Sequence, residues 1–308
     1  MTGAIELRDV TVRYGDTVAV DAMNVTLAGG QIHGLLGRNG SGKTSLLSVA
    51  AGFRRASGGE VLLDGQPVFE NPAAVRQLCL IRGAGDTVEH DWPGDKVTHA
   101  LELAAVLRPR WDREMASRLT ARFVLPLRTR LSELSRGQRA ALGVVLGLAS
   151  RAPITLFDET HLGMDVPSRY AFYEELVAEQ VEHPRTFILS THHIDEVASL
   201  FETVLIIDQG RVLMHEEADT LRTRGAAVTG PCEAVEAFTA DLEVLATKRL
   251  GPTRSDTVYG ELDHQHQRRA ADLGLSLDPV PLQDLFVHLT EPTDRAYVHA
   301  GTGRGDRR

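Results

Sequence analysis

Apolar positions along this chain fall into short runs that alternate with longer segments of helical spacing. Apolar and β-branched runs predict strands at 5–12, 18–27, 31–36, 61–63, 78–81, 154–157, 187–189, 204–207 and 211–214. Apolar residues three and four positions apart predict helices at 44–51, 97–107, 113–123, 138–149 and 167–180. Because strands separated by helices form parallel sheets with both faces covered, we expect an α/β fold over residues 1–220, with ligands at the carboxyl ends of its strands.

The pattern changes after residue 221, where the stretch 222–227 predicts a junction. Beyond it, the spacing predicts a helix at 231–250, a strand at 257–262, a helix at 265–274 and a last short helix at 281–289. We therefore expect a small α+β extension over residues 225–295. Residues 296–308 end in GTGRGDRR, which has no apolar side chain, so we expect a disordered tail there.

Composition narrows the class of protein without identifying it. The 308 residues include 33 Lys and Arg against 42 Asp and Glu, a net charge of −9, so we expect no nucleic-acid partner. Two cysteines cannot build a disulfide scaffold, and the first residues lack the basic start and apolar core of a signal peptide. The longest apolar stretch, 140–149, is shorter than the roughly 20 residues that cross a bilayer. These features predict a reduced, soluble, intracellular protein.

A glycine-rich motif follows the strand predicted at 31–36 and precedes the helix predicted at 44–51. Its sequence, GRNGSGKT, fits the P-loop pattern G-x-x-x-x-G-K-[ST]. The glycines allow a tight turn whose N–H groups bind phosphate, and the helix dipole adds positive potential. The lysine is suited to the β- and γ-phosphates, and the threonine to Mg²⁺. The predicted nucleotide-binding residues are Gly37, Arg38, Asn39, Gly40, Ser41, Gly42, Lys43, Thr44 and Ser45.

Two acidic residues, Asp158 and Glu159, follow the apolar run at 154–157. By itself, this pattern favours a strand that runs into a solvated acidic turn. Beside a P-loop, the first carboxylate is suited to hold Mg²⁺ and the second to polarise a water molecule that attacks the γ-phosphate. We therefore interpret Thr44 and Asp158 as metal ligands and Glu159 as a catalytic residue.

The remaining motifs resemble those of ATP-binding-cassette (ABC) ATPases, and they occur in the same order. LSRGQ at 134–138 resembles the LSGGQ signature, although by itself a Ser/Gly helix cap would explain it. Ser-Thr-His at 190–192 resembles the segment with the family's switch histidine, and Gly-Met-Asp at 163–165 resembles its D-loop. The resemblance covers residues 5–215. It implies a P-loop NTPase cassette with a parallel core sheet, an antiparallel β subdomain and a helical signature subdomain.

The resemblance implies roles for individual residues. His192 would contact the γ-phosphate and orient Glu159. Tyr14 stands where the family has an aromatic residue that stacks on adenine, although local packing of a strand tyrosine would also explain it. Members of the family pair head to tail and hold each ATP between the P-loop of one copy and the signature of the other. At this composite site we expect Leu134, Ser135, Arg136, Gly137, Gln138 and the D-loop residue Asp165.

The resemblance also implies a function. We expect the ATP- and Mg²⁺-dependent ATPase subunit of an ABC transporter, bound to a separately encoded permease at the cytoplasmic face of the cell membrane. The Trp111-Asp112 pair and the C-terminal extension resemble exporter-type cassettes for drug or antimicrobial-peptide efflux, although a packed core aromatic would also explain Trp111. The alternative is a nucleotide-dependent regulatory or soluble ABC-type ATPase with weak hydrolysis.

Two departures from the family pattern bear on these roles. Gly83 stands where the family has the Q-loop glutamine that links the nucleotide to the permease, so either Asp86 or Glu89 substitutes for it or coupling is weaker. Glutamine at position 83 would then strengthen coupling. Thr160 replaces the proline after the catalytic glutamate, a change that removes no catalytic group.

Overall fold

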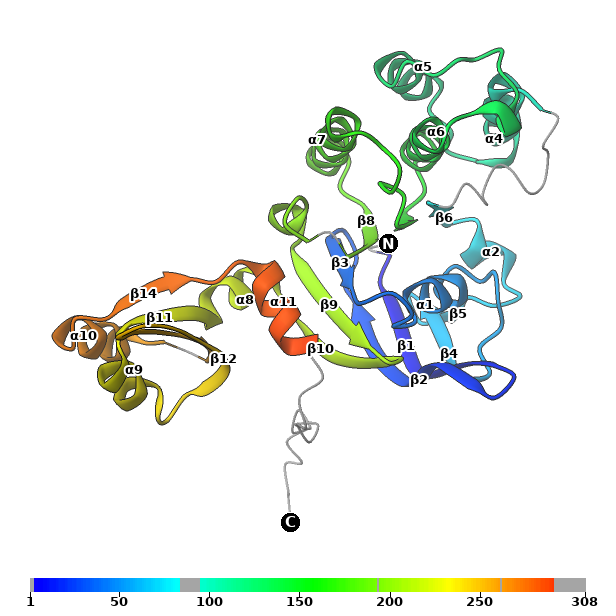
Figure 1. The fold of residues 1–308 in the computed structure, drawn as a ribbon. Helices are drawn as coiled ribbons and strands as arrows, with labels where there is room; N and C mark the ends of the chain where they lie inside the picture. The colour runs from blue at the N-terminus through cyan, green and yellow to red at the C-terminus, as the bar shows by residue number, and fades with distance from the viewer. Residues whose placement is uncertain (1–2, 84–94, 193, 261, 291–308) are drawn as a thin grey trace.

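The computed structural model describes residues 3–83, 95–192, 194–260 and 262–290, and these form three β-sheets (Figure 1). The largest sheet has the strand order β10-β9-β3-β8-β7-β6. All of its strands are parallel except β10, which is antiparallel to β9 at one edge. The bounds are β3 (Ile32–Leu36), β6 (Leu78–Arg82), β7 (Ile154–Asp158), β8 (Thr186–Thr191), β9 (Thr203–Asp208) and β10 (Arg211–Glu217).

An antiparallel sheet of order β2-β1-β4-β5 covers one face of the large sheet, with one helix between the two sheets. The apolar side chains of this sheet, of that helix and of one face of the large sheet belong to one core. The elements are β1 (Ile5–Tyr14), β2 (Thr17–Leu27), α1 (Lys43–Ala50), β4 (Gly58–Leu63), β5 (Gln66–Pro67) and α2 (Pro72–Val75).

Helices cover the opposite face (Figure 1). Helix α6 packs on β6 and β7 and also contacts α4, α5 and α7. The bounds are α4 (Val97–Leu107), α5 (Arg113–Arg122), α6 (Arg136–Ala149) and α7 (Val166–Glu182), with short 3₁₀ turns at Leu131–Glu133 and Ala198–Leu200. The strands and helices predicted before residue 220 are therefore confirmed, with ends that differ by a few residues.

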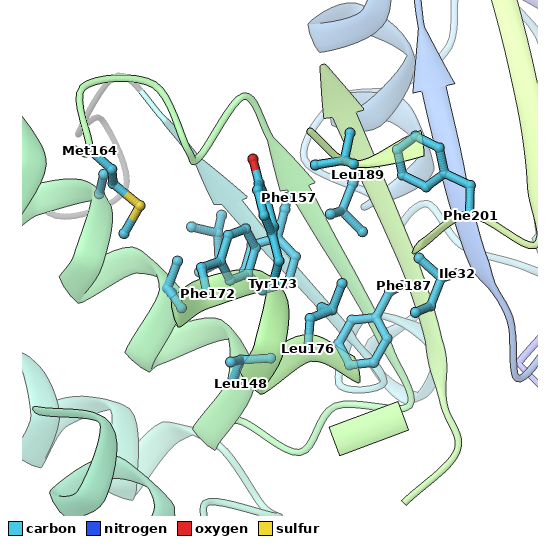
Figure 2. Packing of buried hydrophobic residues seen from close by; sticks show 14 of the residues in the cluster. Ile32, Leu148, Phe157, Met164, Phe172, Tyr173, Leu176, Phe187, Leu189 and Phe201 are labelled. Atoms are coloured by element: carbon cyan, nitrogen blue, oxygen red, sulfur yellow. The ribbon is translucent and has the colours of Figure 1, made fainter. Parts of the chain in front are cut away.

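Alternation along the central strands explains why both faces of the large sheet are covered. In β7, Ile154 and Leu156 belong to the core that contains α1, whereas Phe157 belongs to the core that contains α6 and α7. Figure 2 shows Phe157 beside Phe172 of α7, with ring centroids 5.1 Å apart. A central strand that is buried on both faces has a continuous apolar run, which is why these strands were predictable.

Residues 218–290 form a second unit around a four-stranded antiparallel sheet of order β12-β13-β11-β14. Helices α9 and α10 pack on one face of this sheet, over a core that includes Val228, Val235, Phe238 and Val258. After α8, the chain order of the elements is βαββαβ. The bounds are α8 (Ala218–Arg224), β11 (Gly225–Pro231), α9 (Cys232–Thr239), β12 (Glu243–Leu250), β13 (Thr253–Tyr259), α10 (His264–Asp272), β14 (Ser276–Pro279) and α11 (Leu282–Thr290).

The single helix predicted at 231–250 is wrong. The chain forms α9, turns where the Leu242 N–H donates to the Thr239 carbonyl at 3.0 Å, and then forms the edge strand β12. Strand β11 also occupies part of the predicted junction, and β14 was not predicted. The spacing of apolar residues in 231–250 suits both a helix and a strand, and only pairing with β13 decides between them. The tail predicted at 296–308 lies outside the described residues.

Helix α11 brings the C-terminal unit back onto the first one. Leu285 and Phe286 are buried in the same core cluster as side chains of α6 and α7. The Asp195 N–H also donates to Oε1 of Gln283 at 3.4 Å. Within the described ranges, no helix combines the length and the apolar character that a membrane span requires.

Candidate functional site

The glycine-rich motif at 37–44 connects the carboxyl end of β3 to the first turn of α1. Gly40 and Gly42 have φ angles of +82° and +106°, in the region that favours glycine. A Cβ on Gly37 would lie 2.3 Å from Ser41 Oγ, and a Cβ on Gly42 would lie 2.2 Å from the carbonyl oxygen of Ala19. The loop therefore needs glycine both for its backbone shape and for space.

Lys43 folds back over the loop that precedes it. Its side chain is buried, and Nζ donates to the carbonyl oxygens of Gly37 at 2.8 Å and Arg38 at 3.2 Å. Thr44 is exposed in the same turn, and Ser41 Oγ is buried without a hydrogen-bond partner among the described residues. The first N–H groups of a helix also lack partners within the helix. A cation, two hydroxyls and a helix amino end are suited to bind a polyphosphate.

Asp158 and Glu159 lie at the carboxyl end of β7, next to that of β8. The Asp158 carboxylate is buried, and its Oδ1 accepts a hydrogen bond from Ser190 Oγ at 2.6 Å. The same hydroxyl accepts from the backbone N–H of Glu159 at 2.9 Å. Glu159 has a φ of +50°, which is uncommon for a residue other than glycine. Ser190 thus positions both acidic residues, a role that no sequence motif indicated.

Two side chains that are far apart in the sequence meet at Oε1 of Glu159. Lys43 Nζ lies 3.2 Å from this oxygen, and His192 Nδ1 also lies 3.2 Å from it. Burial of Glu159 opposes its charged form, but the charge of Lys43 and hydrogen bonds from His192 and Lys43 outweigh burial, so the pKa of Glu159 is lowered. The carboxylate is therefore ionised at neutral pH and can accept a proton.

Tyr14 ends β1 beside the amino end of α1. Its hydroxyl accepts a hydrogen bond from Ser45 Oγ at 3.3 Å, and 45% of the residue is exposed. An exposed aromatic ring at this position is available to stack on a planar ligand.

The segment 134–138 begins helix α6. Leu134 is buried, whereas Ser135 is exposed and caps the helix. The Ser135 N–H donates to Gln138 Oε1 at 2.9 Å, and the Gln138 N–H donates to Ser135 Oγ at 3.2 Å. Gly137 lies against the segment 163–165, since a Cβ on it would lie 2.9 Å from the carbonyl oxygen of Gly163. The start of α6 therefore has a structural role in helix capping. This is the alternative explanation of the 134–138 motif, that of a Ser/Gly helix cap.

Asp165 begins the next helix, α7. Its Oδ1 accepts a hydrogen bond from the backbone N–H of Ser168 at 2.9 Å, and its side chain is exposed. Helices α6 and α7 belong to the core on the face of the large sheet opposite α1. Within one chain, the structure thus brings Lys43, Glu159 and His192 together. Helices α6 and α7 lie on the face of the large sheet that is opposite the P-loop helix α1.

Comparison with known proteins matches part of the chain to a family. Residues 20–161 match the family model of the ABC transporter. This segment contains the P-loop, the 134–138 motif and both acidic residues. This segment is similar to the ATP-binding cassette of ABC transporters.

Relatives of the cassette include ATP-binding proteins named for import and others named for export. The spermidine/putrescine import ATP-binding protein PotA of Nitrosomonas europaea is 33% identical over 216 residues, which cover 68% of this chain and 58% of that protein. The Nod factor export ATP-binding protein I of Cupriavidus pinatubonensis is 27% identical over 309 residues, which cover 94% of this chain and 91% of that protein. The match to PotA thus spans less than two thirds of that relative.

Solved structures share the fold of the cassette. The structure of cbiO1 from Clostridium perfringens has a TM-score of 0.58 at 21% identity and covers 71% of this chain and 90% of its own. A dimeric bacterial ABC transporter cassette has a TM-score of 0.61 at 21% identity and covers 70% of this chain and 98% of its own. The predicted fold class, a P-loop α/β cassette with an antiparallel β subdomain and a C-terminal extension, is confirmed.

Gly83 of the cassette contacts the backbone of the acidic pair. Its N–H donates to the carbonyl oxygen of Asp158 at 2.7 Å. A Cβ on Gly83 would lie only 2.0 Å from the carbonyl oxygen of Glu159. The backbone therefore leaves no room for the glutamine that we expected to strengthen coupling. The two residues considered as substitutes, Asp86 and Glu89, lie outside the described residues.

The turn after Glu159 is fixed by side chains where the family has proline. Thr160 Oγ1 donates to the carbonyl oxygen of Ile81 at 3.3 Å. The imidazole of His161 is buried, and its Nε2 lies 3.1 Å from Thr191 Oγ1. These two contacts connect the turn to β6 and β8, and no sequence motif indicated either of them.

The Trp111-Asp112 pair holds the helical part of the cassette together. Asp112 caps α5 by accepting the Met115 N–H at 2.9 Å, and it also pairs with Arg151 at 2.8 Å. Trp111 packs, partly buried, against the core on the α6 side. The packing role considered for Trp111 is thus present in the structure.

Proposed function

We propose that this chain binds ATP with Mg²⁺ and hydrolyses the ATP to drive a membrane transporter. The observation that carries the proposal is the convergence of Lys43, Glu159 and His192 beside a P-loop. An ionised carboxylate next to a phosphate-binding loop is suited to accept a proton from the water that attacks the γ-phosphate.

Each side chain of the site has a distinct task in this proposal. The loop N–H groups and Lys43 bind the β- and γ-phosphates, which requires Lys43 to exchange its carbonyl partners for phosphate oxygens. Thr44 and Asp158 supply the hard oxygen ligands that suit Mg²⁺, and the ion, when bound, neutralises phosphate charge. His192 orients Glu159 through their shared hydrogen bond, and Tyr14 stacks on adenine.

The catalytic unit in this proposal is a head-to-tail pair of chains. Each chain has one P-loop and one signature, and within a chain these belong to opposite faces of the large sheet. The exposed Ser135 and the amino end of α6 are suited to contact the γ-phosphate bound by a second copy, and Asp165 lies beside them. ATP then stabilises the pair because its contacts with both copies exist only in the closed state.

Exposed apolar side chains on α4 support a membrane-protein partner. Leu103, Val106 and Leu107 are 42%, 80% and 65% exposed, so α4 presents apolar surface to solvent. We propose that a cytoplasmic helix of a separately encoded permease covers them and holds the chain at the cytoplasmic face of the membrane.

Export is the direction that we propose. The match to the Nod factor export protein continues through the C-terminal extension, whereas the match to the PotA importer covers 68% of this chain. A regulatory ATPase with weak hydrolysis is the second candidate, because Gly83 supplies no side chain where the family has glutamine.

ATP hydrolysis by the purified full-length chain tests the catalytic part of the proposal. We expect Glu159→Gln to lower turnover by a factor of about 10²–10⁴ while ATP binding persists, and Lys43→Ala to weaken ATP binding. Lys248→Ala, at an exposed lysine of β12, is the matched control. Unchanged phosphate release by Glu159→Gln would contradict the role given to Glu159.

Copurification from membranes tests the transport part. The permease that binds the chain is identified, and both proteins are placed in vesicles with known orientation. ATP-dependent movement of substrate away from the side that holds this chain supports export. Movement toward that side supports import, and a chain that hydrolyses ATP without a membrane partner supports the regulatory candidate.

A further inference from the structure

The ring of Tyr14 has an arginine stacked on it. The guanidinium carbon of Arg54 lies 4.0 Å from the centroid of the Tyr14 ring, a short distance for a cation–π contact. Arg54 follows the P-loop helix α1 in the chain, whereas Tyr14 ends β1. The contact therefore joins the two segments that border the proposed adenine site.

The position of the guanidinium is fixed independently of the ring. Its Nη2 donates to the carbonyl oxygen of Arg13 at 2.9 Å. Among the described residues, no carboxylate lies within ion-pair distance of Arg54. The ring face is thus the main electrostatic partner of this cation in the described part of the chain.

Tyr14 remains partly open to solvent although Arg54 lies against its ring. The Nε of Arg54 is buried without a hydrogen-bond partner among the described residues. Tyr14 nevertheless keeps 45% of its surface exposed. Because a guanidinium covers one face of a ring, the opposite face of Tyr14 is the one on which a planar base would stack.

We propose that Arg54 is a positioning residue for nucleotide binding, which holds Tyr14 as the central layer of an arginine–tyrosine–adenine stack. This inference rests on the proposed function and adds a residue to the base-binding part of the site. The hydrogen bond to Arg13 fixes the guanidinium, the guanidinium fixes the ring plane, and the base then binds a ring that is already ordered. A cation on one face of the ring also draws π-electron density away from the other face, which favours stacking of an electron-rich purine there.

Binding of two probes to the full-length chain tests this role. The probes are ATP with Mg²⁺ and inorganic tripolyphosphate with Mg²⁺, which keeps the phosphates but has no base. Arg54→Met removes the charge and keeps an unbranched apolar side chain, and we expect it to weaken ATP binding about three- to tenfold. We expect tripolyphosphate binding to stay within about twofold, because the P-loop is unchanged.

Two controls separate this role from others. Arg55→Met changes the neighbouring arginine, whose guanidinium lies 5.9 Å from the ring of Phe69 rather than on Tyr14, and we expect no change with either probe. In a Tyr14→Ala background, Arg54→Met is expected to have no further effect on ATP binding.

Several outcomes would overturn the proposal. Tighter ATP binding by Arg54→Met would mean that Arg54 occupies the place of the base. Equal losses for both probes would mean that Arg54 acts on the phosphates or on folding. Unchanged ATP binding would remove the role altogether. A wild-type chain that binds tripolyphosphate and ATP equally well would also overturn it, and one that binds neither probe would instead refute the proposed function.

Discussion

The contact between Gly83 and the acidic turn makes a quantitative prediction for the variant Gly83→Ala. The added Cβ would lie 2.0 Å from the carbonyl oxygen of Glu159, whereas ordinary contact begins at 3.4 Å. The end of β6 and the Glu159 peptide must therefore separate by about 1.4 Å. Because Glu159 has a φ of +50° and is fixed by Ser190, this peptide has few alternative positions.

A shift of this size falls on the catalytic carboxylate and not on the phosphate-binding loop. Misplacement of a catalytic group by about 1 Å can cost a factor of about 10² in rate, so we expect kcat to fall about 100-fold. The P-loop backbone, between β3 and α1, is not among the nearest groups that the added Cβ would meet, so we expect KM for ATP to change less than about threefold. A fall in kcat while KM stays nearly constant distinguishes this effect from general damage to the fold.

The assay is steady-state phosphate release by the full-length chain, with thermal unfolding measured in parallel. Gly58→Ala is the matched control, because a Cβ there would meet the nearest atom, Thr11 Cβ, at 3.6 Å, an ordinary contact. Gly83→Gln brings the same Cβ and is therefore expected to lower kcat rather than restore coupling. A Gly83→Ala chain with kcat within about twofold of wild type would refute the reasoning.

Three further predictions concern stability. Ser135→Ala removes a helix cap and is expected to lower the free energy of unfolding by about 1 kcal/mol in urea titrations. A large loss of ATPase activity under conditions where this variant stays folded would favour a second role of Ser135 across the dimer. Burial lowers the pKa of His33 to about 4, so the stability due to its neutral form is complete above pH 6.5 and is lost as the pH falls through 4. Relative to His33→Gln, wild type should therefore lose about 3 kcal/mol between pH 7 and pH 4, and equal losses in both chains would contradict this. Glu179→Leu removes the buried carboxylate 3.2 Å from the buried Arg185 and should cost about 3–5 kcal/mol in chemical denaturation; a loss below about 1 kcal/mol would mean that water or another group compensates.

The sequence by itself determined the architecture of the first 220 residues. Strands that are buried on both faces consist largely of apolar residues, such as Ile154, Leu156 and Phe157 in β7, and local sequence is then sufficient to predict them. The P-loop was equally readable, because Gly40 and Gly42 adopt backbone angles that other residues rarely adopt. In both cases the physical requirement acts on neighbouring residues, so it leaves a local pattern.

Only the tertiary structure decided the features that depend on residues far apart in the chain. Strand β12 forms because it pairs with β13, and the spacing of apolar residues in 231–250 does not reveal that pairing. The approach of Gly83 to Glu159, the hydroxyl of Ser190 that positions both acidic residues, and the stacking of Arg54 on Tyr14 each join segments from different elements. Contacts of this kind are set by how strands and helices pack in space, and one sequence records only that the residues are present.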